Sequence, residues 1–163
     1  MMSVFIRQLT LADASDAAVI FDEMYRFYFP NPPRFADIEP YLTKRVLSAN
    51  SSMTVVGIFS QEKLSGFATF TTLFPAPSLS GQMFIKDLFI SEKWRAQRLG
   101  LRLLKYLAKQ AIENGCTRLD WTAEQSNPKA GAFYRKIGAT HVTDKEYFRF
   151  SDEALSQFAQ SKL

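Results

Sequence analysis

The sequence predicts an α/β fold in which helices flank a mixed central sheet. Residues 53–60 and 65–74 read as two strands joined by a polar turn, which predicts an antiparallel hairpin. Residues 83–104 read as a strand, a basic loop and a helix, and residues 118–123 follow as another strand. A strand, a helix and a strand in this order imply a right-handed crossover and a parallel pair. The sheet is therefore expected to contain both kinds of pairing.

Length and composition favour a single domain over residues 1–163. The chain has 163 residues, of which 47% are hydrophobic and 22% charged, a composition typical of a globular protein. It contains 15 Phe and 6 Tyr, more aromatic side chains than a small core usually needs. Some of them are therefore expected to line a pocket or an interface.

The charged residues are intermixed. With 20 Lys and Arg against 16 Asp and Glu, the net charge of +4 favours anionic partners. The chain has no dense basic run and no recognisable nucleic-acid-binding motif, so no nucleic-acid partner is expected. The single cysteine, Cys116, excludes an intramolecular disulfide and a cysteine-based zinc cluster, and the single His141 excludes a histidine-rich site. We therefore expect no bound metal.

No targeting or membrane-spanning pattern is recognisable. Residues 1–9 lack the basic and apolar regions of a signal peptide, and no stretch reaches the roughly 18 apolar residues of a membrane span. The sequence thus predicts a cytoplasmic protein without a membrane partner.

The N-terminal part begins with a short strand at residues 4–8 and a helix capped by Thr10. Apolar residues recur at helical spacing as far as Tyr28, where following prolines forbid continuation. The end of this helix admits two interpretations. It is either an amphipathic core helix with an apolar end, or the wall of a substrate site that holds a cation through carboxylate and aromatic contacts. The side chains of the second interpretation are Asp22, Glu23, Tyr25 and Tyr28. A second helix is expected at residues 37–47.

The basic loop within residues 83–104 is suited to phosphate. The helix that follows it exposes unpaired N–H groups and a positive dipole end just past a strand. Arg95, Arg98 and Arg102 add cationic donors, and Gly100 lets a ligand approach the backbone closely. The alternative is an ordinary strand–helix connection with a solvated basic loop.

The C-terminal part predicts one helix, a closing pair of strands and a final helix. Asn127 is placed as an N-cap with Pro128 at the first helical position, and Gly138 ends that helix. Residues 140–143 and 146–151 are expected to be strands. The final helix is expected at residues 152–160.

Two stretches, taken together, resemble the GNAT superfamily of acyl-CoA-dependent N-acetyltransferases. They are Lys86-Asp-Leu-Phe-Ile with Trp94-Arg-Ala-Gln-Arg-Leu-Gly-Leu-Arg-Leu-Leu104, and Asn127-Pro-Lys-Ala-Gly-Ala-Phe-Tyr-Arg-Lys-Ile-Gly138. In that family the pattern Arg/Gln-x-x-Gly-x-Gly/Ala holds the CoA pyrophosphate through backbone N–H groups. Arg95 and Gly100 match this pattern, and Arg98 stands in the place of its first glycine. The resemblance implies the GNAT fold, with acetyl-CoA as the cosubstrate.

The resemblance also implies roles for particular residues. The strand around Leu88, Phe89 and Ile90 would pair with the pantetheine arm of CoA. The loop and helix start would bind the phosphates, and their residues are Arg95, Ala96, Gln97, Arg98, Leu99, Gly100, Leu101 and Arg102. Asn127 would bind CoA instead of, or as well as, capping its helix. Tyr134 would protonate the leaving thiolate, its alternative being a tyrosine that merely packs.

An alkyl ammonium has an ordinary pKa of about 10.4 and must lose a proton before it attacks a thioester. Three candidates stay open for the base. They are Glu124 at the end of a strand, Asp87, and a chain of water molecules.

Within the superfamily the chain is most similar to the spermidine/spermine and thialysine acetyltransferase branch, although Lys86 stands where that branch usually has Glu. The expected reaction is direct transfer of acetyl, in a ternary complex, to a primary amine of a small polyamine or amino compound. A protein lysine, a peptide or an aminoglycoside is the alternative acceptor. A non-catalytic acyl-CoA-binding regulatory module is the alternative function. Many relatives dimerise, so a homodimer is also compatible with the sequence.

Overall fold

The computed structural model describes residues 3–162. The chain divides into two compact units, one ending at Thr122 and the other beginning at Ala123, and each is described by itself. The expectation of one domain over the whole chain stays a prediction.

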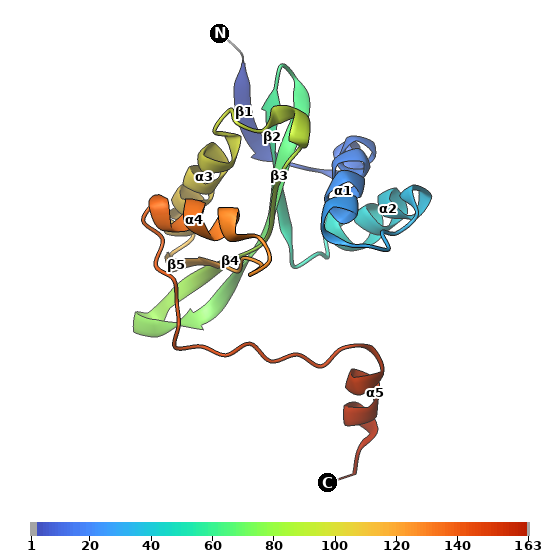
Figure 1. Ribbon diagram of the computed structural model, residues 1–163, viewed down its shortest axis with the longest axis vertical. Coiled ribbons are helices and arrows are strands. Elements are labelled where there is room, and N and C mark those ends of the chain that lie inside the picture. The colour runs from blue at the N-terminus through green and yellow to red at the C-terminus, as the bar shows by residue number, and fades with distance from the viewer. Residues whose placement is uncertain (1–2, 163) are drawn as a thin grey trace. The chain divides into compact units, whose positions relative to one another are not determined.

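The first unit is built on a five-stranded mixed sheet (Figure 1). Its strand order is β1-β2-β3-β4-β5, in which the first three pairings are antiparallel and β4 pairs with β5 in parallel. This confirms the predicted mixed sheet, the hairpin and the parallel pair. The strands are β1 Val4–Gln8, β2 Thr54–Ser60, β3 Lys63–Ala76, β4 Ser80–Ile90 and β5 Cys116–Trp121.

Helices cover both faces of this sheet, with α1 and α2 on one side and α3 on the other (Figure 1). The predicted helix at residues 37–47 is present as α2, which continues into a π-helical turn. The helical segments are the 3-10 turn Leu11–Asp13, α1 Ala14–Tyr28, α2 Phe35–Tyr41, the π turn Leu42–Val46, the 3-10 turns Pro77–Leu79 and Glu92–Trp94, and α3 Leu99–Glu113.

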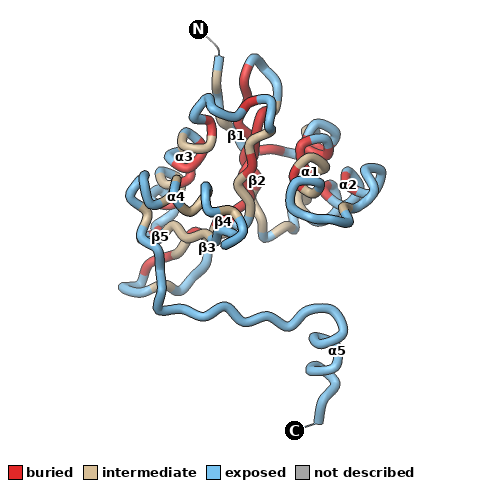
Figure 2. The backbone as a smooth tube through the Cα atoms, in the orientation of Figure 1, coloured by how far each residue is buried: buried red, intermediate tan, exposed pale blue. Residues whose placement is uncertain are grey.

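The core on the α1 side of the sheet is aromatic. Phe67 of β3 is fully buried and stacks on Phe21 of α1, with the ring centroids 4.1 Å apart. Phe89 of β4 lies 6.3 Å from Phe67. Figure 2 shows that buried residues follow the strands and the inward faces of α1 and α3. Burial of these large rings holds α1 against β3 and β4, the strands that carry the candidate site.

The second unit contains α4 Pro128–Lys136 and α5 Asp152–Gln160. The Asn127 side chain accepts a 3.3 Å hydrogen bond from the backbone N–H of Ala130, which confirms the predicted N-cap. The predicted strands at residues 140–143 and 146–151 are wrong, because this segment belongs to no sheet of the described chain. Side-chain alternation favours an extended backbone, but a strand also needs hydrogen-bonding partners. Residues 139–162, here called the C-terminal arm, are mostly exposed (Figure 2).

Candidate active site

A bulge interrupts the pairing of β3 and β4. Thr69 pairs with Asp87 whereas Phe70 pairs with Ile85, so Lys86 is an extra residue without a cross-strand partner. Bulges of this kind re-aim the side chains of a strand and are frequent beside active sites. Lys86 is the position at which the sequence departs from the branch that it resembles. Its Nζ lies 3.6 Å from Oδ1 of Asp87 at the surface.

Asp87 interacts with polar groups of β3 and α1. The Thr69 hydroxyl of β3 donates a 2.5 Å hydrogen bond to Oδ2 of Asp87. The pKa of Tyr25 in α1 is raised, first because its phenol is partly buried and then through electrostatic interactions with Tyr41 and Asp87. A carboxylate near a phenol ring is suited to an alkyl ammonium, since the carboxylate balances its charge and the ring attracts a cation.

The other residues predicted to bind the amine substrate make contacts within the fold. Asp22 forms an ion pair with Arg26 at 2.8 Å, while its other carboxylate oxygen is buried without a hydrogen-bond partner among the described residues. Glu23 accepts a 2.8 Å hydrogen bond from the backbone N–H of Glu92 and so caps the turn that precedes the basic loop. The Tyr28 ring lies 6.5 Å from that of Phe89. Tyr25 is the predicted residue whose phenol interacts electrostatically with Asp87.

The sheet opens beside the second half of β4. The parallel pairing of β4 with β5 ends where Ile85 meets Trp121, although β4 continues to Ile90. Backbone groups of successive residues in a strand point alternately to its two neighbouring strands. The groups of residues 86–90 that point toward the β5 side therefore have no β5 partner. The carbonyl of Ile90 is nevertheless paired, since it accepts a 3.1 Å hydrogen bond from Nε of Arg95. The open side includes the backbone of Leu88, one of the residues predicted to meet a pantetheine arm, whereas Phe89 pairs with Phe67 of β3.

The basic loop presents consecutive unpaired amides. Within the described chain, the backbone N–H groups of residues 96–101 have no hydrogen-bond partner, and the first amide bonded into α3 is that of Arg102, which donates to the carbonyl of Arg98 at 3.1 Å. The six amides comprise those of Ala96, Gln97, Arg98, Leu99, Gly100 and Leu101. Together with the positive end of the α3 dipole, they form a backbone concavity of the type that binds anions.

Arg98 adopts a left-handed backbone conformation. Its φ of 58° and ψ of 21° lie in the left-handed region, and Ala96 has a φ of 65°. Glycine adopts this region without steric cost, whereas an L-residue is disfavoured there by about 1–2 kcal/mol. The loop therefore retains the left-handed turn at this position and adds a cationic side chain to it.

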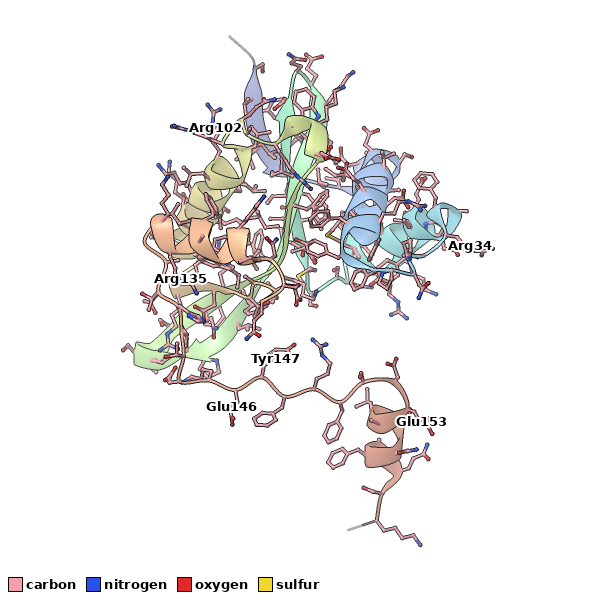
Figure 3. All side chains as sticks on the ribbon, viewed as in Figure 1. Arg34, Arg102, Arg135, Glu146, Tyr147 and Glu153 are labelled. Atoms are coloured by element: carbon pink, nitrogen blue, oxygen red, sulfur yellow. The ribbon has the colours of Figure 1, made fainter. Side chains whose placement is uncertain are left out.

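The three loop arginines are placed differently. The guanidinium of Arg95 lies over the rings of Phe27, at 5.0 Å, and Phe89, at 5.7 Å, which ties the loop to α1 and β4. Arg98 and Arg102 are exposed near the start of α3, and Arg102 extends from its outer side (Figure 3). Their charges are available to a bound phosphate.

The second unit carries the remaining predicted residues. The Oδ1 atom of Asn127 is engaged in the α4 cap. Tyr134 is half-buried on α4, with its ring 5.4 Å from that of Phe133. Glu124 is exposed, and its carbonyl accepts a 2.9 Å hydrogen bond from the N–H of Asn127. Their roles toward a substrate stay proposals.

Two residues near the candidate site were not predicted to belong to it, namely Tyr41 and Thr69. No local pattern distinguishes them from other residues of their helix and strand. Their interactions with Tyr25 and Asp87, respectively, depend on the packing of α1 and α2 and on the register of β3 with β4. No metal-binding group of three His, Cys, Asp or Glu residues occurs between residues 3 and 162, and no helix there is long and apolar enough to cross a bilayer.

Comparison with known proteins identifies the family. The model of the acetyltransferase (GNAT) family matches residues 18–139. The chain belongs to the GNAT family. This confirms the resemblance carried by the basic loop and by the segment around Asn127 and Tyr134, together with the GNAT fold expected from it.

Curated GNAT relatives share part of their length with this chain. Thialysine N-epsilon-acetyltransferase of Bos taurus is 29% identical over 80 residues, which are 47% of each protein. L-ornithine N5-acetyltransferase NATA1 of Arabidopsis thaliana is 30% identical over 92 residues, or 56% of this chain and 40% of the relative. The chain thus spans about half the length, or less, of these curated relatives.

Solved GNAT-like structures share the fold more completely. An integron cassette protein from the mobile metagenome of V. cholerae is 44% identical and superposes with a TM-score of 0.94 over 99% of this chain and 100% of that one. Ribosomal-protein-alanine N-acetyltransferase of Brucella melitensis is 22% identical, with a TM-score of 0.76 over 91% of this chain and 100% of that one. The second likeness concerns the fold alone.

Proposed function

We propose that this GNAT protein transfers acetyl from acetyl-CoA to the primary amine of a small polyamine or amino compound, directly and within a ternary complex. The observation that carries the proposal is the run of six unpaired amides at the start of α3, beside the open side of β4. Family membership supports acetyl-CoA as the cosubstrate that these features bind. The cytoplasmic location expected from the sequence stays a prediction.

The first unit supplies the groups that would hold the cosubstrate. The pyrophosphate would accept hydrogen bonds from the amides of residues 96–101, with Arg98 and Arg102 adding positive charge. The pantetheine amides would pair with the backbone of Leu88 that has no β5 partner, as an added strand pairs with a sheet edge. Arg95 would support phosphate binding indirectly, because its stacking on Phe27 and Phe89 holds the loop in position.

The chemistry requires two proton transfers. The neutral amine attacks the thioester carbonyl carbon, so that a C–N bond forms and the C–S bond breaks. The attacking nitrogen loses one proton to a base, and the thiolate that leaves takes one from an acid. We assign the acid to the Tyr134 hydroxyl and the binding of the ammonium form to Asp87. Asp87, Glu124 and a chain of water molecules remain the candidates for the base.

Asp87 and Tyr25 favour an acceptor that is cationic when it arrives. The Asp87 carboxylate and the Tyr25 phenol interact with each other within the first unit. Two of the curated relatives carry names that specify acetylation of thialysine and L-ornithine, compounds with a primary amine on a flexible chain. We therefore place amino acids with side-chain amines and short polyamines first among the acceptors.

The test is release of free thiol from acetyl-CoA over a panel of amines. The panel contains ornithine, thialysine, lysine, spermidine, an aminoglycoside and a lysine peptide. We expect turnover with ornithine, thialysine or spermidine, and much slower turnover with Asp87→Asn. Glu62→Gln, an exposed change in the β2–β3 turn, is the matched control and should behave as the wild type. Acetyl-CoA that raises Tm without turnover of any amine would indicate a non-catalytic acyl-CoA-binding module and overturn the enzyme proposal.

A further inference from the structure

The bulge in β4 brings two opposite charges together at the surface. Lys86 is the extra residue of the bulge, and its Nζ atom lies 3.6 Å from Oδ1 of Asp87. Consecutive residues of a regular strand point to opposite faces of the sheet, so their side chains do not meet. The bulge breaks this alternation, because it adds a residue to β4 that has no opposite number in β3. The ammonium therefore lies beside the carboxylate that we assign to binding of the acceptor.

The two oxygens of the Asp87 carboxylate have different surroundings. Oδ2 accepts the hydrogen bond from Thr69, which is buried. Oδ1 is near Nζ of Lys86, at a distance longer than a hydrogen bond. The side chain of Lys86 is 64% exposed, and that of Asp87 is 24% exposed. Thr69 thus holds the carboxylate from the interior, whereas Lys86 approaches it from the solvent.

The Lys86 ammonium is free to bind a ligand. An exposed ion pair of this length contributes little to the free energy of unfolding, so the fold does not depend on it. None of the three N–H donors of the ammonium forms a hydrogen bond with Asp87 at this distance. The four-carbon stem of a lysine is flexible, so Nζ can follow an anionic group over several ångströms.

Lys86 also lies where the sheet begins to open. It is the first residue of β4 beyond the pairing with β5, which ends where Ile85 meets Trp121. Leu88, with its proposed contact to the pantetheine arm, follows two residues later. All of these residues belong to the first unit. An acceptor whose ammonium binds Asp87 therefore brings any second charged group close to Lys86.

We propose that Lys86 makes the site select an acceptor that carries a carboxylate as well as its amine, an amino acid rather than a polyamine. This inference rests on the proposed function and specifies its substrate class. The acceptor ammonium binds Asp87 and the acceptor carboxylate binds Lys86, so that each charge meets its opposite. A polyamine instead brings a second cation toward Lys86, and like charges repel. Selection thus combines an attraction for one class of amine with a repulsion of the other.

Ornithine and putrescine test the proposal as a matched pair, because putrescine is ornithine without its carboxylate. We expect the wild type to have a kcat/KM for ornithine about tenfold higher than for putrescine, and ornithine methyl ester to behave like putrescine. Lys86→Glu is expected to lower kcat/KM for ornithine and to raise it for putrescine, by about tenfold each. Lys86→Gln should remove most of the preference.

The matched control is Lys109→Glu, which makes the same change of charge at an exposed position of α3. It should leave the ratio of the two kcat/KM values as in the wild type. Acetylation of both amines with the same ratio in the wild type and in Lys86→Glu would overturn the role of Lys86. That result would leave acetyl transfer itself intact.

A binding measurement separates this inference from the proposed function. In calorimetric titrations with CoA present, the wild type should bind ornithine about tenfold more tightly than ornithine methyl ester, and Lys86→Glu should lose this preference. The preference without turnover of any amine would overturn acetyl transfer and support the assignment to Lys86. The absence of both turnover and preference would overturn both proposals.

Discussion

The Thr69 hydroxyl donates a 2.5 Å hydrogen bond to Asp87 across the bulge at Lys86. This contact holds a carboxylate that interacts with the phenol of Tyr25. The extra residue in β4 and the partner on β3 together determine where that carboxylate points.

Asp87→Asn should remove the charge without removing the acceptor of the Thr69 hydrogen bond. We expect kcat/KM for a cationic amine to fall by about 10²–10³, in the range typical of a lost proton acceptor or charge partner. KM for acetyl-CoA should change little, because Asp87 is not one of the residues whose amides are proposed to bind the pyrophosphate. Steady-state kinetics with both substrates measures this difference. Wild-type kinetics in the variant would remove Asp87 from the site.

Arg98→Gly should be more stable than Arg98→Ala. Both variants lose the guanidinium, but glycine adopts the left-handed φ of 58° freely and alanine does not. The expected difference in the free energy of unfolding is about 1 kcal/mol. Urea denaturation of the two variants checks it, and equal stabilities would show that the loop relaxes out of this conformation.

Arg95→Lys should destabilise the loop although the charge is kept. An ammonium does not reproduce the Nε hydrogen bond to Ile90 or the flat stacking of a guanidinium on Phe27 and Phe89. We expect a loss of about 1 kcal/mol in unfolding free energy and weaker CoA binding. Arg102→Lys, an exposed change in α3, is the control. Equal effects of the two changes would contradict a structural role for Arg95.

Tyr134→Phe should lower kcat while leaving the fold intact, because the ring is retained and only the hydroxyl is lost. A reduction of about 10²-fold is expected for loss of a general acid. The effect should be smaller for an acyl donor whose leaving thiol is more acidic, since such a thiolate needs less help from an acid. A uniform effect with all donors would instead indicate a packing role.

The Asp13 carboxylate should make part of the free energy of unfolding depend on pH in the acid range. A hydrogen bond from Arg7 is the main cause that lowers the pKa of Asp13 from 3.8 to about 2, and the Thr10 N–H contributes. The Asp13 carboxylate binds a proton less readily in the folded state than in the unfolded state. Its contribution to the free energy of unfolding is therefore present above about pH 4 and is lost as the pH falls through about 2.

Asp13→Asn should therefore destabilise the protein at pH 7 by roughly 1 kcal/mol, a figure reduced for solvent screening of a surface pair. The difference from the wild type should shrink between pH 4 and pH 2. Thermal unfolding over this range measures it, with Glu62→Gln as the control. A difference that is independent of pH would contradict the assignment to the carboxylate.

Local patterns predicted most elements and the phosphate-suited loop. Helical spacing of apolar residues placed α1 and α3, and Asn127 with Pro128 marked the start of α4, because these signals act between residues close in sequence. The loop amides followed in the same way, since any helix that starts after a strand leaves its first N–H groups unpaired. These features needed no knowledge of the neighbouring strands.

The sequence by itself determined the order of helices and strands, the anion-suited loop and the resemblance to the GNAT family. The tertiary structure decided that Lys86 is a bulge residue, that Asp87 is bonded to Thr69 and that Glu23 caps a turn. It also decided that residues 140–151 stay unpaired although they alternate as strands do. The physical reason is that register and strand pairing are set by partners distant in sequence, whereas periodicity reports only which conformation a segment favours when a partner is available.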